Sequence, residues 1–217
     1  MKTILHKNLA NIIVIVRIAF VFVVIFLFNA GVFLFDLEAL GLLTVTALLD
    51  WADGYVARRL NISSKIGGLL DTVGDRITEN LFFVFFAYKN IVPLYLPLFF
   101  ITRSFLADFI RTLSFKSGMG TFDMHKSRLG GIFVASQFSR ILYLVMKFAI
   151  FFMAGFILTL KDSGLFTFLM APLQNAVLAV SALTAVFCLL RFACLLYDSR
   201  STLRQEFVEG KTDLKKQ

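Results

Sequence analysis

Residues 50–75 read DWADGYVARRLNISSKIGGLLDTVGD and place four aspartates inside a strongly apolar chain. Asp50 and Asp53 are three residues apart, and Asp71 and Asp75 are four apart, so on helices each pair shares one face. A carboxylate at membrane depth is costly and is by default a functional-site candidate. Two such faces turned toward each other would form an oxygen-only site for hard divalent cations. The stretch therefore predicts two helices and a metal site between them.

The composition indicates that these acids belong to a membrane protein. Of the 217 residues, 59% are hydrophobic, and the mean hydropathy is +0.82, whereas a soluble domain is about 45–50% apolar. We expect one all-α integral membrane domain over residues 1–217, with a basic cytoplasmic tail at 198–217. The 27 phenylalanines suit a lipid-facing surface. The net charge of +8 indicates cytoplasmic loops beside anionic membrane lipids and not a nucleic-acid partner.

Six apolar runs are long enough to form transmembrane helices, which need about 20 residues each. They cover residues 9–30, 34–57, 67–88, 91–115, 129–159 and 171–197. Pro93 and Pro97 open the fourth run and Pro172 the sixth, because proline is tolerated in the first turn of a helix. The aspartates fall at the facing ends of the second and third runs. We predict six transmembrane helices.

The charges of the connecting loops predict the orientation of these helices. One set of loops is basic, as is the C-terminal tail, whereas the opposite loops contain only two basic residues. The basic set comprises Lys2, Lys7, Arg58, Arg59, Lys65, Lys116, Lys126 and Arg128, and the opposite loops contain Lys89 and Lys161. By the positive-inside rule, both termini and the linker between the aspartate pairs face the cytoplasm. We expect a multi-pass protein of a bacterial or archaeal plasma membrane with its active site on the cytoplasmic side.

Bound divalent ions would supply the counter-charge that four neighbouring carboxylates need. Oxygen ligands favour magnesium, calcium or manganese, and a pair of such ions is usual in displacement at phosphorus. We expect two ions, Mg²⁺ or Mn²⁺. Gly54 and Gly67 leave room for a phosphate or nucleotide because they lack a side chain, and Ala57 places only a small side chain on the same face. Arg58 supplies a forked donor for a diphosphate.

The chain resembles the CDP-alcohol phosphatidyltransferases at every fixed position of their motif, here Asp50-x2-Asp53-Gly54-x2-Ala57-Arg58-x8-Gly67-x3-Asp71-x3-Asp75. Near the N-terminus, Asn11-x5-Arg17 is similar to a further element of the family, in which Val14 stands where threonine is usual. The resemblance implies an enzyme that moves a phosphatidyl group from CDP-diacylglycerol to a small alcohol and releases CMP.

The resemblance also implies a role for each motif residue. Asp50, Asp53 and Asp71 would be the main metal ligands. Asp75 would contact one metal and act as the general base that takes the proton of the acceptor hydroxyl. The CDP-lipid would lie against Asn11, Arg17, Gly54, Ala57, Arg58 and Gly67. Membrane lipids and a second copy of the chain, as a homodimer, are the further partners implied. The alternative without catalysis is that the acids only pair with Arg58, Arg59 and Arg76.

The acceptor pocket is predicted from charges on the later helices. Arg103 and Arg111 are eight residues apart and lie nearly in line along one helix face. They resemble the Arg-x7-Arg pair of phosphatidylglycerophosphate synthases, and with Lys126 they would bind a phosphorylated acceptor such as glycerol 3-phosphate. The simpler alternative is that both arginines reach toward the membrane interface. Asp108 is expected to pair with Arg103 or Arg111.

Two other readings stay open at the level of sequence. The form Asp71-Thr-Val-Gly-Asp75-Arg76 is similar to inositol-type members, in which later arginines bind inositol phosphate. Arg140 and Arg191 are candidates for that role. A divalent-cation transporter is the alternative from another functional class, although its polar groups would have to line a path through the membrane. Glu79 either orients the base and Arg76 or completes the polar network of the site.

Overall fold

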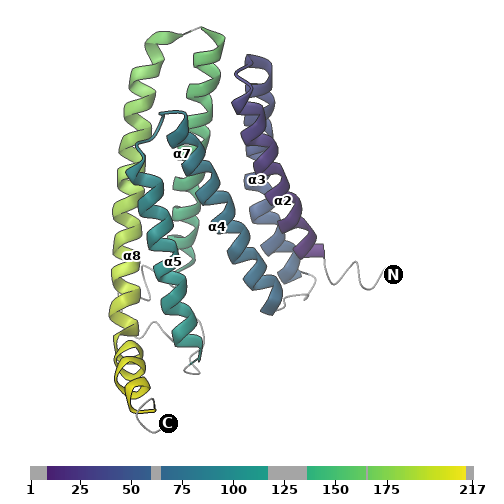
Figure 1. Ribbon diagram of the computed structural model, residues 1–217. Helices are drawn as coiled ribbons and strands as arrows, with labels where there is room; N and C mark the ends of the chain where they lie inside the picture. Colours follow the sequence, from purple (N-terminus) through teal and green to yellow (C-terminus); the bar gives the residue numbers. More distant parts are fainter. Residues whose placement is uncertain (1–8, 60–64, 117–135, 165, 214–217) are drawn as a thin grey trace. The chain divides into compact units, whose positions relative to one another are not determined.

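The computed structural model describes residues 9–59, 65–116, 136–164 and 166–213, and within these ranges it contains helices and no strand (Figure 1). The all-α prediction is thereby confirmed for the described residues. Within these ranges, six long helices and one short 3-10 helix follow each other. They are α2 (Leu9–Asn29), α3 (Phe33–Arg59), α4 (Lys65–Tyr88), α5 (Tyr95–Lys116), α7 (Gln137–Ser163), η2 (Thr167–Leu169) and α8 (Met170–Asp213).

Each predicted apolar run corresponds to one long helix, but several bounds differ. The fourth helix begins at Tyr95 and not at residue 91, because the chain turns sharply after α4. Asn90 has a φ of 59°, its N–H donates to the Ala87 carbonyl at 3.0 Å, and the Ile91 N–H donates to the Phe86 carbonyl at 2.9 Å. These two bonds form a Schellman motif, which ends a helix. The predicted start of the fifth run, residues 129–135, lies outside the described residues.

Three of the described helices are long and apolar enough to cross a membrane. The candidate spans are Asn11–Asn29, Phe138–Ser163 and Met170–Arg200. On α2, the large apolar side chains of Ile15, Phe22 and Phe26 are exposed, as expected for a surface in contact with lipid. Helices α3, α4 and α5 carry more charged residues, including the motif aspartates. The membrane prediction is supported, and the six-span topology stays a prediction.

The chain divides into two compact units, and the first comprises Met1–Pro97 and Lys147–Val180. In this unit α2 packs against both α3 and α4. Its core is aromatic: Phe28, Phe82, Phe83, Phe86 and Phe151 are at most 1% exposed. The Phe151 ring lies 5.0 Å from that of Phe83 and 5.1 Å from that of Phe82, centroid to centroid. The interpretation of phenylalanine as lipid-facing bulk is therefore incomplete, because these rings also build the core.

The second unit comprises Leu98–Met146 and Ser181–Gln217. It contains most of α5, the first part of α7 and the later part of α8. Ala107 and Ile110 of α5 pack with Leu195 of α8, and the partly buried Phe192 lies against them. This small apolar cluster joins the helix that carries Arg103 to the helix that carries Arg191.

Candidate active site

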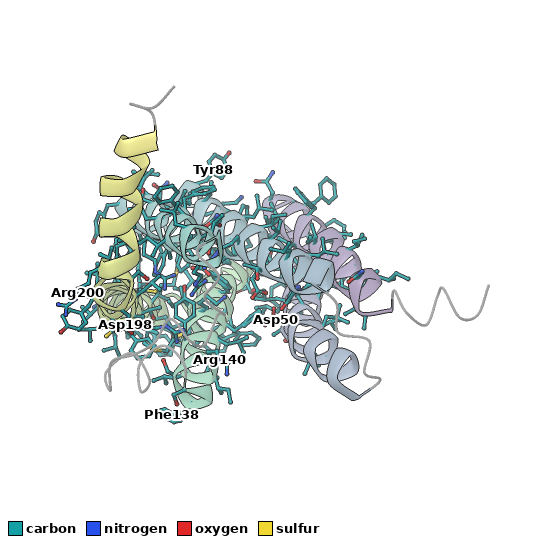
Figure 2. The ribbon with its side chains drawn as sticks, turned by 90° about the horizontal axis from the view of Figure 1, so that it is seen from below. Asp50, Tyr88, Phe138, Arg140, Asp198 and Arg200 are labelled. Carbon is teal, nitrogen blue, oxygen red and sulfur yellow. The ribbon has the colours of Figure 1, made fainter. Side chains whose placement is uncertain are left out.

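Three aspartates of the motif gather around one buried arginine in the first unit. Arg17 of α2 is fully buried, and its guanidinium forms ion pairs with carboxylates of α3 and α4. Nη1 pairs with Asp50, which is labelled in Figure 2. Nη2 lies 3.0 Å from an oxygen of Asp75 and 3.5 Å from an oxygen of Asp71. The prediction that residues from both aspartate pairs face each other is thus met by Asp50, Asp71 and Asp75.

Local helix geometry explains why these side chains meet. Asp71 and Asp75 are separated by one turn of α4, so both project from the face that lies against α2. Gly74 allows the close approach, because a Cβ atom there would lie 2.7 Å from Val14 Cγ1 and 2.9 Å from Arg17 Nη2. Val14, which stands where the family has threonine, is buried in this contact. Gly74 was not singled out from the sequence, although its place between two motif aspartates was the available signal.

The exposed fraction of the side chains rises from the buried Arg17 toward the aspartates of α4. The side chain of Arg17 is 0% exposed, that of Asp50 11%, that of Asp75 39% and that of Asp71 47%. Solvent and dissolved ligands therefore reach the carboxylates of α4 while the guanidinium stays covered. Among the side chains that the structure describes, no three acidic, histidine or cysteine residues are arranged to share one metal ion. The described carboxylates are arranged around the guanidinium instead.

A second ionic network lies one turn beyond Asp75. Glu79 is 1% exposed, and its Oε2 lies 3.3 Å from Lys147 Nζ of α7 and 3.6 Å from Arg76 Nη1. The predicted link between Glu79 and Arg76 is present. Lys147 was missed by sequence reasoning, although a lysine inside an apolar helix is itself a signal of a buried partner. This network joins α4 to α7 close to the residues of the motif.

Several predicted site residues can be placed only in part. Asp53, Gly54, Ala57 and Arg58 belong to α3, but the structure does not describe their side chains, and Lys126 lies outside the described residues. Asn11 is half-buried in the first turn of α2, and Gly67 is half-buried in the first turn of α4. Their assignment to the CDP-lipid stays a prediction.

In the second unit, two arginines share one tyrosine. The guanidinium carbons of Arg103 and Arg191 each lie 5.7 Å from the centre of the Tyr143 ring. Arg191 also donates to the carbonyl of Ser139 at 2.9 Å and to its hydroxyl at 2.7 Å. Within the described part of the chain, the buried Nε of Arg103 has no hydrogen-bond partner. Two guanidinium groups in a buried setting have the chemistry that binding an anion requires.

The remaining acceptor candidates are more exposed. Arg111 pairs with Asp108 at 3.3 Å, which confirms the expected pairing of Asp108 with one of the two arginines of α5. Arg140 is exposed at the start of α7, near Phe138, and both are labelled in Figure 2. The structure thus brings together Arg103 from the glycerol-phosphate prediction and Arg191 from the inositol-phosphate alternative, and leaves Arg140 at the surface.

Comparison with known proteins supports the family resemblance that the motif indicates. The profile of the CDP-alcohol phosphatidyltransferase family matches residues 7–187. A putative cardiolipin synthase of Mycobacterium tuberculosis (strain ATCC 25618 / H37Rv) is 40% identical over 65 residues, which are 30% of this chain and 31% of that protein. A CDP-diacylglycerol–glycerol-3-phosphate 3-phosphatidyltransferase of Rickettsia bellii is 28% identical over 107 residues, 49% of this chain and 59% of that protein.

A protein of the same name from Pseudomonas fluorescens is 34% identical over 70 residues, 32% of this chain and 36% of that protein. The chain thus spans between 31% and 59% of the lengths of these three relatives. No solved structure matches the chain.

Proposed function

The chain belongs to the CDP-alcohol phosphatidyltransferase family, and from this premise we propose that it transfers a phosphatidyl group from CDP-diacylglycerol to glycerol 3-phosphate and releases CMP. One observation carries the proposal: Asp50, Asp71 and Asp75 come together from two helices around Arg17. Relatives whose names specify glycerol 3-phosphate as the acceptor support this choice of alcohol.

The donor chemistry of the aspartate group fits Mg²⁺ or Mn²⁺, because carboxylate oxygens are the ligands these ions prefer. Asp50, Asp53 and Asp71 would hold two ions, with Asp75 contacting one. When bound, the ions supply positive charge that stabilises the attacking and leaving oxygens of the displacement. Asp71 and Asp75 keep 47% and 39% of their side chains exposed, so ions and substrates can reach them.

Asp75 is the proposed general base. Its partly exposed carboxylate can accept the proton of an acceptor hydroxyl. Once the proton has moved, the acceptor oxygen attacks the phosphorus on the lipid side of the diphosphate. The bond between that phosphorus and the bridging oxygen breaks, and the electron pair leaves with CMP.

Arg103 and Arg191 are proposed to bind the phosphate of the acceptor, with Arg111 and Lys126 adding positive charge. Two guanidinium groups at one tyrosine ring suit a phosphate, which accepts forked hydrogen bonds. A phosphorylated acceptor is therefore favoured over a neutral alcohol such as inositol or serine. The clustered Arg17 and aspartates favour an enzyme over a cation transporter, because a buried arginine would hinder the passage of a cation.

The topology belongs to the same proposal. Six helices would cross the membrane with both termini in the cytoplasm, and the active site would open to the cytoplasmic side, where CMP and the acceptor are dissolved. A bacterial or archaeal plasma membrane and a homodimeric assembly remain part of this proposal as expectations from the family.

The test incubates the purified chain with CDP-diacylglycerol, Mg²⁺ or Mn²⁺, and one acceptor at a time. Glycerol 3-phosphate, inositol phosphate, inositol and serine are compared by CMP release and by identification of the lipid product. We expect turnover with glycerol 3-phosphate. Turnover with inositol phosphate alone would change the proposed acceptor and leave the proposed reaction in place. If no CMP is released with any of the four acceptors, the proposal is contradicted.

Asp75→Asn provides the matched test of the general base. The amide has nearly the same shape as the carboxylate but cannot take a proton, so CMP release should fall by about 10²–10⁴-fold. Circular dichroism and the thermal unfolding midpoint report whether the variant is folded. A folded variant with near-native turnover would remove Asp75 from the role of base.

A further inference from the structure

Arg17 contacts three motif aspartates at once. Its Nη1 pairs with Asp50, and its Nη2 lies 3.0 Å from Asp75 and 3.5 Å from Asp71. A fully buried guanidinium is tolerated when carboxylates neutralise it, and close carboxylates in turn need positive charge between them. Arg17 and the aspartates therefore compensate each other without any bound ion.

The packing around Arg17 holds the guanidinium in this position. Gly74 of α4 lies so close that an added Cβ would approach Arg17 Nη2 to 2.9 Å. On the same helix face as Arg17, Val14 is buried against the backbone of α4. The guanidinium is thus enclosed between the helices that carry its partners, and the carboxylates of α4 rather than the arginine face the solvent.

We propose that Arg17 is an internal counter-ion that competes with the divalent ions for Asp50, Asp71 and Asp75. It joins α2, α3 and α4 while the site lacks metal, and it lowers the metal affinity of the carboxylates. Carboxylates that hold a metal ion would move away from the guanidinium. This inference rests on the metal dependence of the proposed function and adds a residue that sets how tightly the ions bind.

The charge balance of the group gives the direction of the effect. Three ionised aspartates carry −3 and Arg17 carries +1, so a cation that approaches the described group meets a net charge of −2. If the arginine is replaced by a neutral residue, the same cation meets −3 and no longer faces a positive neighbour within a few ångströms. Removal of the charge should therefore strengthen metal binding.

The opposite role makes the opposite prediction. If Arg17 only orients the carboxylates for the metal, its removal would let them turn away and metal binding would weaken. Arg17→Gln separates the two roles, because glutamine keeps a polar side chain and loses the charge. Arg17→Lys keeps the charge but replaces the planar, multiple donor with a compact ammonium.

The experiment measures Mn²⁺ binding to the purified chain without substrates, from the electron paramagnetic resonance signal of free Mn²⁺. We expect Arg17→Gln to bind Mn²⁺ at least about tenfold more tightly, since charges at this distance interact strongly near a protein surface. Arg17→Lys should stay close to the wild type. Weaker or unchanged Mn²⁺ binding by Arg17→Gln would overturn the proposal.

Thermal unfolding supplies a second readout, which tests the proposal even if a variant is less stable than the wild type. Arg17→Gln should unfold at a lower temperature than the wild type without metal, and saturating Mn²⁺ should narrow that difference, because the ions replace the missing counter-charge. Lys147→Met is the matched control: it removes a buried cation that pairs with Glu79, so Mn²⁺ should not restore its stability. Equal rescue of both variants by Mn²⁺, or of neither, would contradict the counter-ion role.

These measurements are independent of catalysis. Tighter Mn²⁺ binding by Arg17→Gln, with no CMP release by the wild type, would leave the counter-ion role intact and remove the proposed function. CMP release by the wild type, with Mn²⁺ affinity lowered in Arg17→Gln, would support the proposed function and remove the counter-ion role.

Discussion

Gly74→Ala tests whether the close approach of α4 to α2 positions the aspartate group. The added Cβ would lie 2.7 Å from Val14 Cγ1 and 2.9 Å from Arg17 Nη2, whereas carbon atoms in good contact are about 3.5–4.0 Å apart. Val14 is β-branched and stiff, so α4 must shift by a large fraction of an ångström. Overpacking of this kind costs about 1–3 kcal/mol of folding stability.

The same shift of α4 should also lower turnover. Nη2, the guanidinium nitrogen that the new methyl group displaces, is the nitrogen that contacts Asp71 and Asp75. A displacement near 1 Å at reacting groups can lower turnover by about a hundredfold. We expect Gly74→Ala to lower CMP release by about ten- to a hundredfold at a temperature at which the variant is fully folded.

Gly155→Ala is the matched control. Its Cβ would lie 2.6 Å from Phe28 Cζ and 3.1 Å from Leu40 Cδ2, so it overpacks the aromatic core without touching Arg17 or the aspartates. Both variants should unfold at lower temperature, and only Gly74→Ala should lose turnover beyond its loss of folded protein. If both lose turnover equally, or if Gly74→Ala leaves stability and turnover unchanged, the reasoning from the α2–α4 contact is refuted.

Two further predictions concern the other charged groups. Glu79→Gln leaves Lys147 buried without its carboxylate and should cost about 3–5 kcal/mol of folding stability, while Glu79→Gln with Lys147→Met should cost less than the sum of the single changes. Unfolding midpoints of the four proteins measure this coupling, and strict additivity would mean that the pair contributes no interaction energy. Arg103→Ala should raise the KM for the acceptor by about tenfold or more, because a hydrogen bond to a charged group contributes about 1.5–3 kcal/mol, and should change the KM for CDP-diacylglycerol little. Arg140→Ala at the exposed start of α7 is its control, and equal effects of Arg103→Ala on both substrates would remove Arg103 from the acceptor pocket.

The helices could be predicted well because each apolar run is long and bounded by charged or turn-forming residues. The limits were less accurate where a local turn decides them: α4 ends through the left-handed conformation of Asn90, which delays the start of α5 to Tyr95. The inward-facing phenylalanines were not distinguished from the lipid-facing ones. Composition alone does not separate these two environments, since both are apolar.

Within the candidate site, spacing along one helix was informative and contacts between helices were not. The four-residue spacing of Asp71 and Asp75 predicts their shared face, and the structure bears this out. That Arg17 would bridge them to Asp50 depends on how α2 packs between α3 and α4, which no local spacing encodes. The same holds for Lys147 with Glu79, and for the meeting of Arg103 and Arg191 at Tyr143.

The burial of Arg17 has a consequence for the insertion of the chain into the membrane. Arg17 lies in the candidate span Asn11–Asn29, and a ribosome makes this helix before it makes Asp50, Asp71 or Asp75. An arginine within a lone helix disfavours its transfer into lipid by about 2.5–3.5 kcal/mol at the membrane centre. If α2, α3 and α4 all cross the membrane, as proposed, the acids of α3 and α4 offset this cost of inserting Arg17. Truncation before α4 would remove the ion pairs of this buried charge with Asp71 and Asp75.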